Sequence, residues 1–419
     1  MLVSLVPVAR TLLGSWLEPN VLLAMYWSAF SLASLLLLPH DPIDRGIYVA
    51  LYAVGCSIAG AFVQNQGYRH RVFSSRVGES ANRIRTAVWP AILCTLCGLA
   101  SVVIVLYSAS FSLGSIASLD GLLKVSHTFS VQRYASRYQP PFAAQILLGA
   151  GYAASCFGGT LAVQARQSVV HRGRLALVSL ATFLPAVAIM LVRSERAPFI
   201  LSTVLYVSFY LARGTAVLSL KVVPRRYILY GMAAVPVLMV VFAVVALLRA
   251  GVYEPSLIPE LIRKISSGAF GSLASLSIWA TRTDALVVEP ALGGYTAAGI
   301  YDLLGWRTKV LGLFQDFNVL ATGYRTNIYT LFRPLIEDYT IGGFGLFWLL
   351  FGFASSRAYS SAKAGRVAAA IVLAICYTVI LYSFNTSPFM YNSILMAVVL
   401  YLAWHVIGEN AGEAGEVSG

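Results

Sequence analysis

The stretch Ile228-Leu-Tyr-Gly-Met-Ala-Ala-Val-Pro-Val-Leu-Met-Val-Val-Phe-Ala-Val-Val-Ala-Leu-Leu248 decides the fold class, because it runs for 21 residues without a charged side chain. A helix of this length crosses a hydrocarbon core of roughly 30 Å and satisfies its own backbone polar groups there. Nine further apolar stretches accompany it, so the chain is predicted to be an all-α polytopic integral membrane protein with about ten transmembrane helices. We expect these spans at 21–39, 46–64, 87–108, 141–164, 175–192, 197–212, 228–248, 341–356, 367–384 and 391–407.

The composition favours the same class. Of the 419 residues, 58% are hydrophobic and only 11% are charged, which is outside the range of ordinary soluble domains. The net charge of +13 would fit a nucleic-acid partner only if the basic residues formed one face of a soluble domain. They are instead scattered among short loops, so we expect no nucleic acid as a partner.

The distribution of Lys and Arg predicts the orientation. Alternate short loops carry sixteen basic residues on one side and six on the other. The positive-inside rule places the richer side, together with both termini, in the cytoplasm. An even number of spans also puts both termini on one side.

Two longer loops, 110–140 and 249–340, are then expected outside the cytoplasm. The second contains two amphipathic stretches, 257–276 and 300–314, which fit helices lying at the membrane interface. Residues 1–407 are predicted to form a single transmembrane domain, and the acidic tail 408–419 is predicted to be disordered and cytoplasmic.

The outer side carries a set of arginines. A guanidinium close to the bilayer is costly unless it is paired or faces a polar cavity. One interpretation is that each side chain reaches toward lipid headgroups. The other is a cationic site for a lipid-linked phosphate or diphosphate, since Arg offers paired donors that match phosphate oxygens. The set consists of Arg133 and Arg137, Arg193 and Arg196 around Glu195, and Arg282, Arg325 and Arg333.

The segment 323–345 holds the strongest motif. The side chains of Thr326, Asn327, Tyr329 and Thr330 offer the hydroxyl, amide and aromatic partners that a sugar needs. Asp338 follows as a candidate base for a hydroxyl group. The glycines at 342, 343 and 345 fit close helix packing at the start of the next span.

The arrangement Asn327-x-Tyr-Thr330 … Asp338-x-x-x-Gly342-Gly343 resembles the bacterial oligosaccharide repeat unit polymerases of the Wzy type, which make O-antigen and exopolysaccharide. The resemblance extends to the number of spans, to an outer loop bearing Arg133 and to Arg196-Ala-Pro-Phe199 at the start of a span. The family often has Asp-Phe-Gly where this chain has Asp338-Tyr339-Thr340.

The resemblance implies a GT-C-like membrane glycosyltransferase of the bacterial inner membrane. It would move a growing glycan from undecaprenyl diphosphate onto a new lipid-linked repeat unit on the outer face. Asp338, Arg325 and Arg196 would be catalytic and the remaining residues of the two preceding sets would bind substrate. A chain-length regulator and a flippase would be further partners. The sequence has no D-x-D motif, His/carboxylate cluster or nucleotide loop, so we expect no metal and no cofactor.

Two other functions stay open. An O-antigen ligase-like enzyme uses the same kind of donor, but its relatives rely on a histidine in the large outer loop, and 249–340 contains none. A lipid-linked oligosaccharide flippase or other transporter would fit internal repeats and charges near the middle of the spans. The sequence shows neither, which favours the polymerase.

Overall fold

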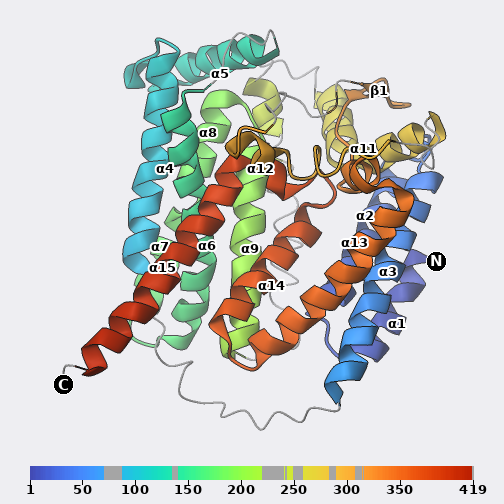
Figure 1. Ribbon diagram of the computed structural model, residues 1–419. Coiled ribbons are helices and arrows are strands. Elements are labelled where there is room, and N and C mark those ends of the chain that lie inside the picture. The colour runs from blue at the N-terminus through green and yellow to red at the C-terminus, as the bar shows by residue number, and fades with distance from the viewer. Residues whose placement is uncertain are drawn as a thin grey trace. The chain divides into compact units, whose positions relative to one another are not determined.

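A computed structural model of the chain describes residues 1–69, 87–134, 140–218, 240, 243–248, 258–282, 289–306, 314 and 316–417 (Figure 1). The chain divides into two compact units, whereas the sequence is expected to form one transmembrane domain. Unit 1 comprises Met1–Ser80, Leu211–Gly231 and Pro259–Tyr391. Unit 2 comprises Ala81–Tyr210, Met232–Ile258 and Asn392–Gly419.

The described residues are almost entirely helical. The helices of unit 1 are α1 (Leu2–Leu13), α2 (Pro19–Leu37), α3 (Asp44–Arg69), α11 (Ile258–Arg282), α12 (Ala298–Leu303), α13 (Phe332–Lys363), α14 (Val367–Tyr382) and the 3-10 turn η4 (Pro388–Met390). Unit 2 contains α4 (Val88–Ser108), the 3-10 turn η2 (Leu113–Ile116), α5 (Leu119–Tyr134), α6 (Phe142–Gln167), α7 (Arg172–Ala181), α8 (Leu184–Arg193) and α15 (Asn392–Val417). The helix α9 (Ala197–Leu218) contributes to both units.

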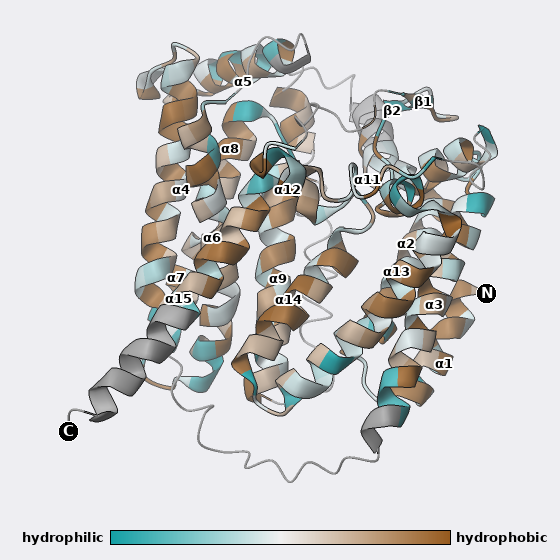
Figure 2. Cartoon of the chain, in the orientation of Figure 1, coloured by the Kyte–Doolittle hydropathy of each residue, from teal (hydrophilic) through white to brown (hydrophobic). Residues whose placement is uncertain are grey.

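Seven helical segments in the described part of the chain are long and apolar enough to cross a membrane. Apolar residues follow most of α4 and the middle part of α13, as the brown colouring of Figure 2 shows. These segments confirm an all-α membrane protein, while the number of ten spans stays a prediction. The helix α14 and the apolar part of α15 are shorter, and most of the expected span 228–248 lies outside the described residues.

Unit 1 is held by close contact between α3 and α13. A Cβ atom at Gly352 would lie 1.9 Å from the carbonyl oxygen of Ser57, and one at Gly60 would lie 1.9 Å from that of Leu349. Only glycine lets the two backbones approach this closely. The buried Asn20 of α2 joins both helices, because it accepts a hydrogen bond from the Ser57 hydroxyl and donates to the Gly352 carbonyl at 3.4 Å.

Aromatic packing fixes the beginning of α13. The ring of Phe332 is fully buried and lies 4.4 Å from that of Trp27 in α2. Trp27 donates its indole N–H to the Ser383 hydroxyl at 3.1 Å, and the Leu331 backbone N–H donates to the Ser383 carbonyl at 2.7 Å. These contacts place the polar residues that follow Phe332 against α11 and the neighbouring loop.

In unit 2, α5 lies across the end of α4 (Figure 1). An apolar cluster joins α4, α5, α6 and α8 and includes Val105, Val125, Phe129, Ile189 and Val192. The Pro-containing start of α8 follows a break after α7, so the span expected at 175–192 consists of two shorter helices. Pro is favoured in the first turn of a helix because it lacks the N–H group that would be unpaired there.

In the loop 249–340, several polar residues of the described part are more buried than the amphipathic pattern predicts. The amphipathic stretch 257–276 is helical as α11, but its serines at 267, 272, 275 and 277 are buried. The stretch 300–314 is helical only to Leu303, and 307–313 lie outside the described residues. A two-stranded antiparallel ribbon follows, formed by β1 (Asn318–Val319) and β2 (Arg325–Thr326).

Three helices differ from the expected spans: α1 was not expected, and α13 and α15 are longer than expected. The helix α1 lies in a segment where no element was expected. The helix α13 begins at Phe332 instead of 341, with a break at Thr340, where φ is 61° and ψ is 177°. The helix α15 continues to Val417, through residues expected to be disordered, and its Ala and Glu residues there are good helix formers.

Candidate functional site

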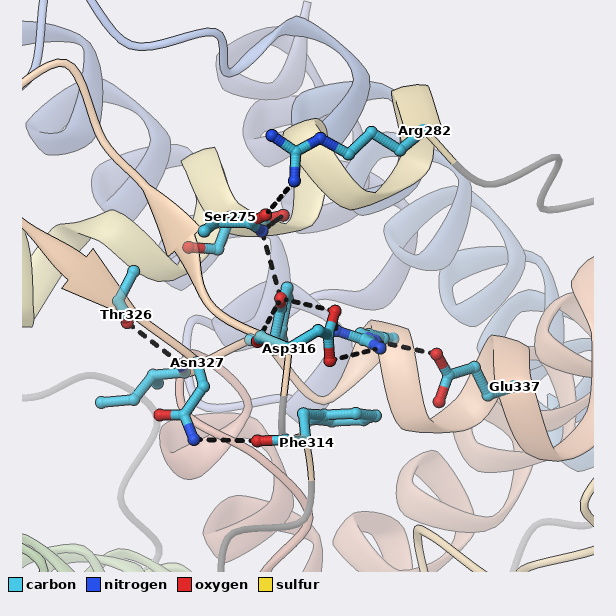
Figure 3. A network of polar contacts seen from close by, with 11 residues as sticks. Ser275, Arg282, Phe314, Asp316, Thr326, Asn327 and Glu337 are labelled. Carbon is cyan, nitrogen blue, oxygen red and sulfur yellow. Dashed lines mark hydrogen bonds and ion pairs between the residues drawn. The ribbon is translucent and has the colours of Figure 1, made fainter. Parts of the chain in front are cut away.

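Arg333 is the centre of a polar cluster in unit 1, and Figure 3 shows its partners Asp316 and Glu337. Its Nη1 and Nη2 atoms donate to the two carboxylate oxygens of Asp316 at 2.8 and 3.1 Å. Its Nε donates at 2.8 Å to Glu337, which lies one helical turn further along α13. The guanidinium is therefore paired on both edges, and its side chain is only 7% exposed.

Aromatic rings enclose the same guanidinium. Its carbon atom lies 3.8 Å from the ring centre of Phe314, 4.0 Å from that of Tyr329 and 5.3 Å from that of Trp279. A cation is attracted to the face of an aromatic ring at these distances. The charge of Arg333 is thus compensated by two carboxylates and three rings, which explains how it can be buried.

The cluster continues from Asp316 to α11. The Tyr329 hydroxyl donates to the Asp316 carboxylate at 3.0 Å and accepts from the Asn318 amide at 3.1 Å. Asn318 also donates to the Ser275 carbonyl at 3.1 Å, and its own oxygen accepts from Arg282 at 3.2 Å. A chain of side chains therefore connects Arg282 with Asp316 and Arg333.

The contacts of the cluster shift the pKa values of Asp316 and Tyr329. Partial burial acts to raise the pKa of Asp316, but the hydrogen bonds and charge of Arg333 outweigh it and hold the pKa below its usual value. Burial raises the pKa of Tyr329 to about 12. Asp316 is thus an anionic group at neutral pH, and its side chain remains 54% exposed.

Asp338, the base expected from the sequence, directly follows Glu337 in α13 and is fully buried. Its carboxylate accepts hydrogen bonds from the Tyr295 N–H at 3.0 Å, the Thr296 N–H at 2.7 Å and the Thr296 hydroxyl at 2.6 Å. Its backbone carbonyl also accepts from the Leu292 N–H at 3.1 Å. These contacts are those of a residue that anchors the turn before α12.

The other expected residues of the segment divide into buried and exposed groups. Thr330 is fully buried and accepts a hydrogen bond from the Phe332 N–H at 3.3 Å, while Asn327 donates to the Phe314 carbonyl at 2.9 Å. Arg325 is exposed on β2, with its guanidinium 5.5 Å from the ring of Phe317. Among the arginines of this loop whose side chains the structure describes, Arg282 and Arg325 are exposed.

Three of the arginines expected in unit 2 lie in α5 and in the turn between α8 and α9. Arg193 forms an ion pair with Glu195 at 2.8 Å. Between them Ser194 has a φ of 51°, and its hydroxyl donates to the Ser126 carbonyl of α5 at 3.2 Å. Arg196 directly precedes α9, and Arg133 is part of α5. Arg137 lies outside the described residues.

The sequence interpretation missed the partners that organise the cluster. Asp316, Asn318, Phe314, Trp279 and Glu337 were not among the expected site residues. The spacing of four residues between Arg333 and Glu337 is a signal for an ion pair on a helix. Asp316 carries no comparable signal, because its pairing depends on how the loop folds back over α13.

In the part of the chain that the structure describes, no three His, Cys, Asp or Glu side chains are grouped as a metal site would require. The cluster can instead offer hydrogen-bond acceptors from Asp316 and positive charge from Arg282 and Arg325. Comparison of the chain with protein-family models, with curated proteins and with solved structures gives no match. The function must therefore be argued from the site.

Proposed function

We propose that the protein is a membrane glycosyltransferase that joins lipid-linked oligosaccharide repeat units into a long polysaccharide on the outer face of a bacterial inner membrane. The observation that carries the proposal is the exposed carboxylate of Asp316, held by the buried Arg333 in a loop that also exposes Arg282 and Arg325. The apolar helices support the proposal, because they fit a bilayer, which is where a lipid-linked substrate would be presented.

The proposed reaction needs no redox step. An acceptor hydroxyl attacks the anomeric carbon of the donor glycan, the bond from that carbon to the diphosphate oxygen breaks, and the hydroxyl proton passes to a carboxylate. The lipid diphosphate leaves as an anion. Exposed arginines can stabilise its developing charge, and Asp316 can accept the proton or orient the hydroxyl.

This assignment changes the role of two expected residues. Asp338 becomes a positioning residue, because its carboxylate is fully buried against the turn at 295–296, whereas the Asp316 side chain is 54% exposed. Arg333 becomes the support for Asp316, because its paired donors already hold that carboxylate. Arg325 remains a candidate for binding the diphosphate, and Arg133, Arg193 and Arg196, which belong to unit 2, remain candidates from the sequence alone.

A chain-extension assay tests the proposal. Purified protein in lipid nanodiscs is given an undecaprenyl-diphosphate repeat unit, and the products are separated by size. We expect a ladder from the wild-type protein, at least a hundredfold less extension from Asp316→Asn, and a tenfold or greater loss from Arg325→Lys. Asp120→Asn, which changes an exposed carboxylate of α5, is the matched control and should retain the ladder.

Experiments in cells separate the alternatives. If the protein is a polymerase, Asp316→Asn cells still carry single repeat units on the surface lipid core. Loss of those single units as well would indicate the ligase-like enzyme or the flippase. Full-length polymer from the Asp316→Asn protein would exclude the site.

A further inference from the structure

A second polar pocket lies in unit 1, away from the cluster around Arg333. It has a volume of about 300 Å³, and its lining includes Ser15, Glu18, Asn65, Ser356, Tyr359 and Lys363. The last three residues are spaced by three and four positions, so α13 presents them on one face. The other residues come from α3 and from the turn between α1 and α2. Gly14 ends α1 with a φ of 79°, a conformation that glycine adopts without strain.

Glu18 is the unusual member of this pocket, because its side chain has no opposite charge. It is 1% exposed and accepts hydrogen bonds from the Asn20 N–H at 2.8 Å, the Asn20 side-chain amide at 2.7 Å and the Val21 N–H at 3.2 Å. All three donors are neutral, and in the described part of the chain neither Glu18 nor Lys363 forms an ion pair.

Burial raises the pKa of Glu18 to about 7, since the neutral donors only partly offset the loss of solvation. The titratable groups near the carboxyl are Tyr359 from α13 and Cys376 and Tyr377 from α14, and Arg10 contributes a charge close to Tyr359. A cation in the pocket would supply the missing counter-charge and return Glu18 to its ionised form.

We propose that this pocket binds a primary ammonium group, with Glu18 as its counter-ion. An ammonium group has three N–H donors, and the pocket offers oxygen acceptors from the hydroxyls of Ser15, Ser356 and Tyr359 and the amide of Asn65. A trimethylated ammonium has no donor for these oxygens, so the pocket should discriminate against it.

The surroundings favour a ligand that also carries a phosphate, such as an ethanolamine lipid headgroup. Lys363 lines the pocket and can meet an anion. Close by in the sequence, the guanidinium of Arg10 lies 5.5 Å from the ring of Trp16, which is 37% exposed. Exposed Trp and Arg residues are typical of the headgroup level of a membrane. A free amine and a lipid headgroup share the ammonium chemistry, and the experiment distinguishes them.

The test uses the full-length protein in phosphatidylcholine nanodiscs at pH 8, with thermal unfolding as the measurement. Ethanolammonium chloride should raise the unfolding temperature, while tetramethylammonium chloride at equal ionic strength should not. If the ligand is the lipid, replacing part of the phosphatidylcholine by phosphatidylethanolamine should also raise the unfolding temperature. It should do so at a much lower total amine concentration than ethanolammonium chloride requires. A shift with the free amine alone identifies a soluble ligand and still supports the pocket.

Variants connect the effect with the pocket. Glu18→Gln retains hydrogen-bond acceptors but not the charge, and should weaken amine binding at least tenfold. Lys363→Met should keep ethanolammonium binding and lose the preference for the lipid. Glu289→Gln removes an exposed carboxylate elsewhere and should behave as the wild type.

A chemical measurement covers the case in which Glu18→Gln does not fold. A hydrophobic carbodiimide reacts with protonated buried carboxyls, so in the wild-type protein it should modify Glu18 at pH 6 to 7, and ethanolammonium should protect that residue. Equal unfolding shifts for the wild type and Glu18→Gln, or labelling of Glu18 that no amine reduces, would overturn the proposal.

Discussion

Replacing Arg333 by Met should destabilise the protein by about 4 kcal/mol. The side chain of Glu337 is only 12% exposed, and without Arg333 it becomes a buried carboxylate with no positive partner. Breaking a buried ion pair from one side costs about 3–5 kcal/mol for this reason. The pair with Asp316 adds about 1 kcal/mol or less, because the Asp316 side chain is 54% exposed and screened by solvent.

The assay is reversible unfolding of the purified protein in mixed micelles, followed by tryptophan fluorescence. The double variant Arg333→Met/Glu337→Gln removes the buried charge together with its partner, so it should recover about half of the loss or more. Arg325→Met is the matched control, since it removes an exposed guanidinium from the same loop. Its effect should stay within about 0.5 kcal/mol.

Two results would refute this reasoning. Arg333→Met could unfold within about 1 kcal/mol of the wild type, which would mean that Glu337 is solvated or protonated without its partner. The double variant could also be as unstable as the single one. The destabilisation would then come from the lost aromatic contacts around the guanidinium and not from the unpaired carboxylate.

Three further predictions concern packing, pH and topology. Gly352→Ala places a Cβ atom 1.9 Å from a backbone carbonyl oxygen of α3, so it should destabilise the protein by about 1–3 kcal/mol in the same unfolding assay. Gly342→Ala is the control, because its Cβ atom would meet nothing within 4 Å and should leave the stability unchanged. Because the pKa of Asp316 is lowered in the folded state, its contribution to stability is present at neutral pH and is lost as the pH falls below about 4. Asp316→Asn should flatten that part of the stability–pH curve, and an unchanged curve would contradict the assigned ion pair. The topology can be tested in a cysteine-free background with single cysteines at two exposed positions, Val319→Cys and Val170→Cys. An impermeant thiol reagent added outside cells should label the first and not the second. The reverse pattern would invert the topology.

The spans could be predicted closely because each depends on a local run of apolar residues. The expected spans 21–39, 46–64, 87–108 and 141–164 agree with α2, α3, α4 and α6 to within a few residues. Bilayer thickness sets their length, and no distant contact is needed to define them. The same reasoning fails for α1, whose 12 residues are too few to register as a span.

The site could be predicted only in part, because sequence shows which side chains are polar but not which are buried. Arg333 and Arg325 are both arginines of one polar segment, yet the first is caged and paired and the second is exposed. The two aspartates also differ in burial: Asp338 is fully buried, whereas the Asp316 side chain is 54% exposed. The aspartate expected to react anchors a turn, and the one not considered meets solvent. The difference arises from the fold of the loop over α13.

The start of α13 was placed too late for a related reason. Residues 332–339 carry Arg333, Glu337 and Asp338, so a hydropathy criterion assigns them to the loop. In the folded chain the charge of Arg333 is balanced by Asp316 and Glu337, and the carboxylate of Asp338 accepts hydrogen bonds from the turn at 291–296. A helical segment with three charged residues is therefore stable beside the membrane-spanning part.

The break at Thr340 separates these two environments within α13. A φ of 61° with a ψ of 177° is a conformation that suits glycine and strains a β-branched residue, so the surrounding contacts must maintain it. On the loop side, Asp338 is held by Tyr295, Thr296 and Leu292. On the membrane side, the glycine contacts with α3 hold the helix after the break. The break thus lets the first two turns of α13 follow the loop while the rest packs against α3, and this division positions Arg333 and, through it, Asp316.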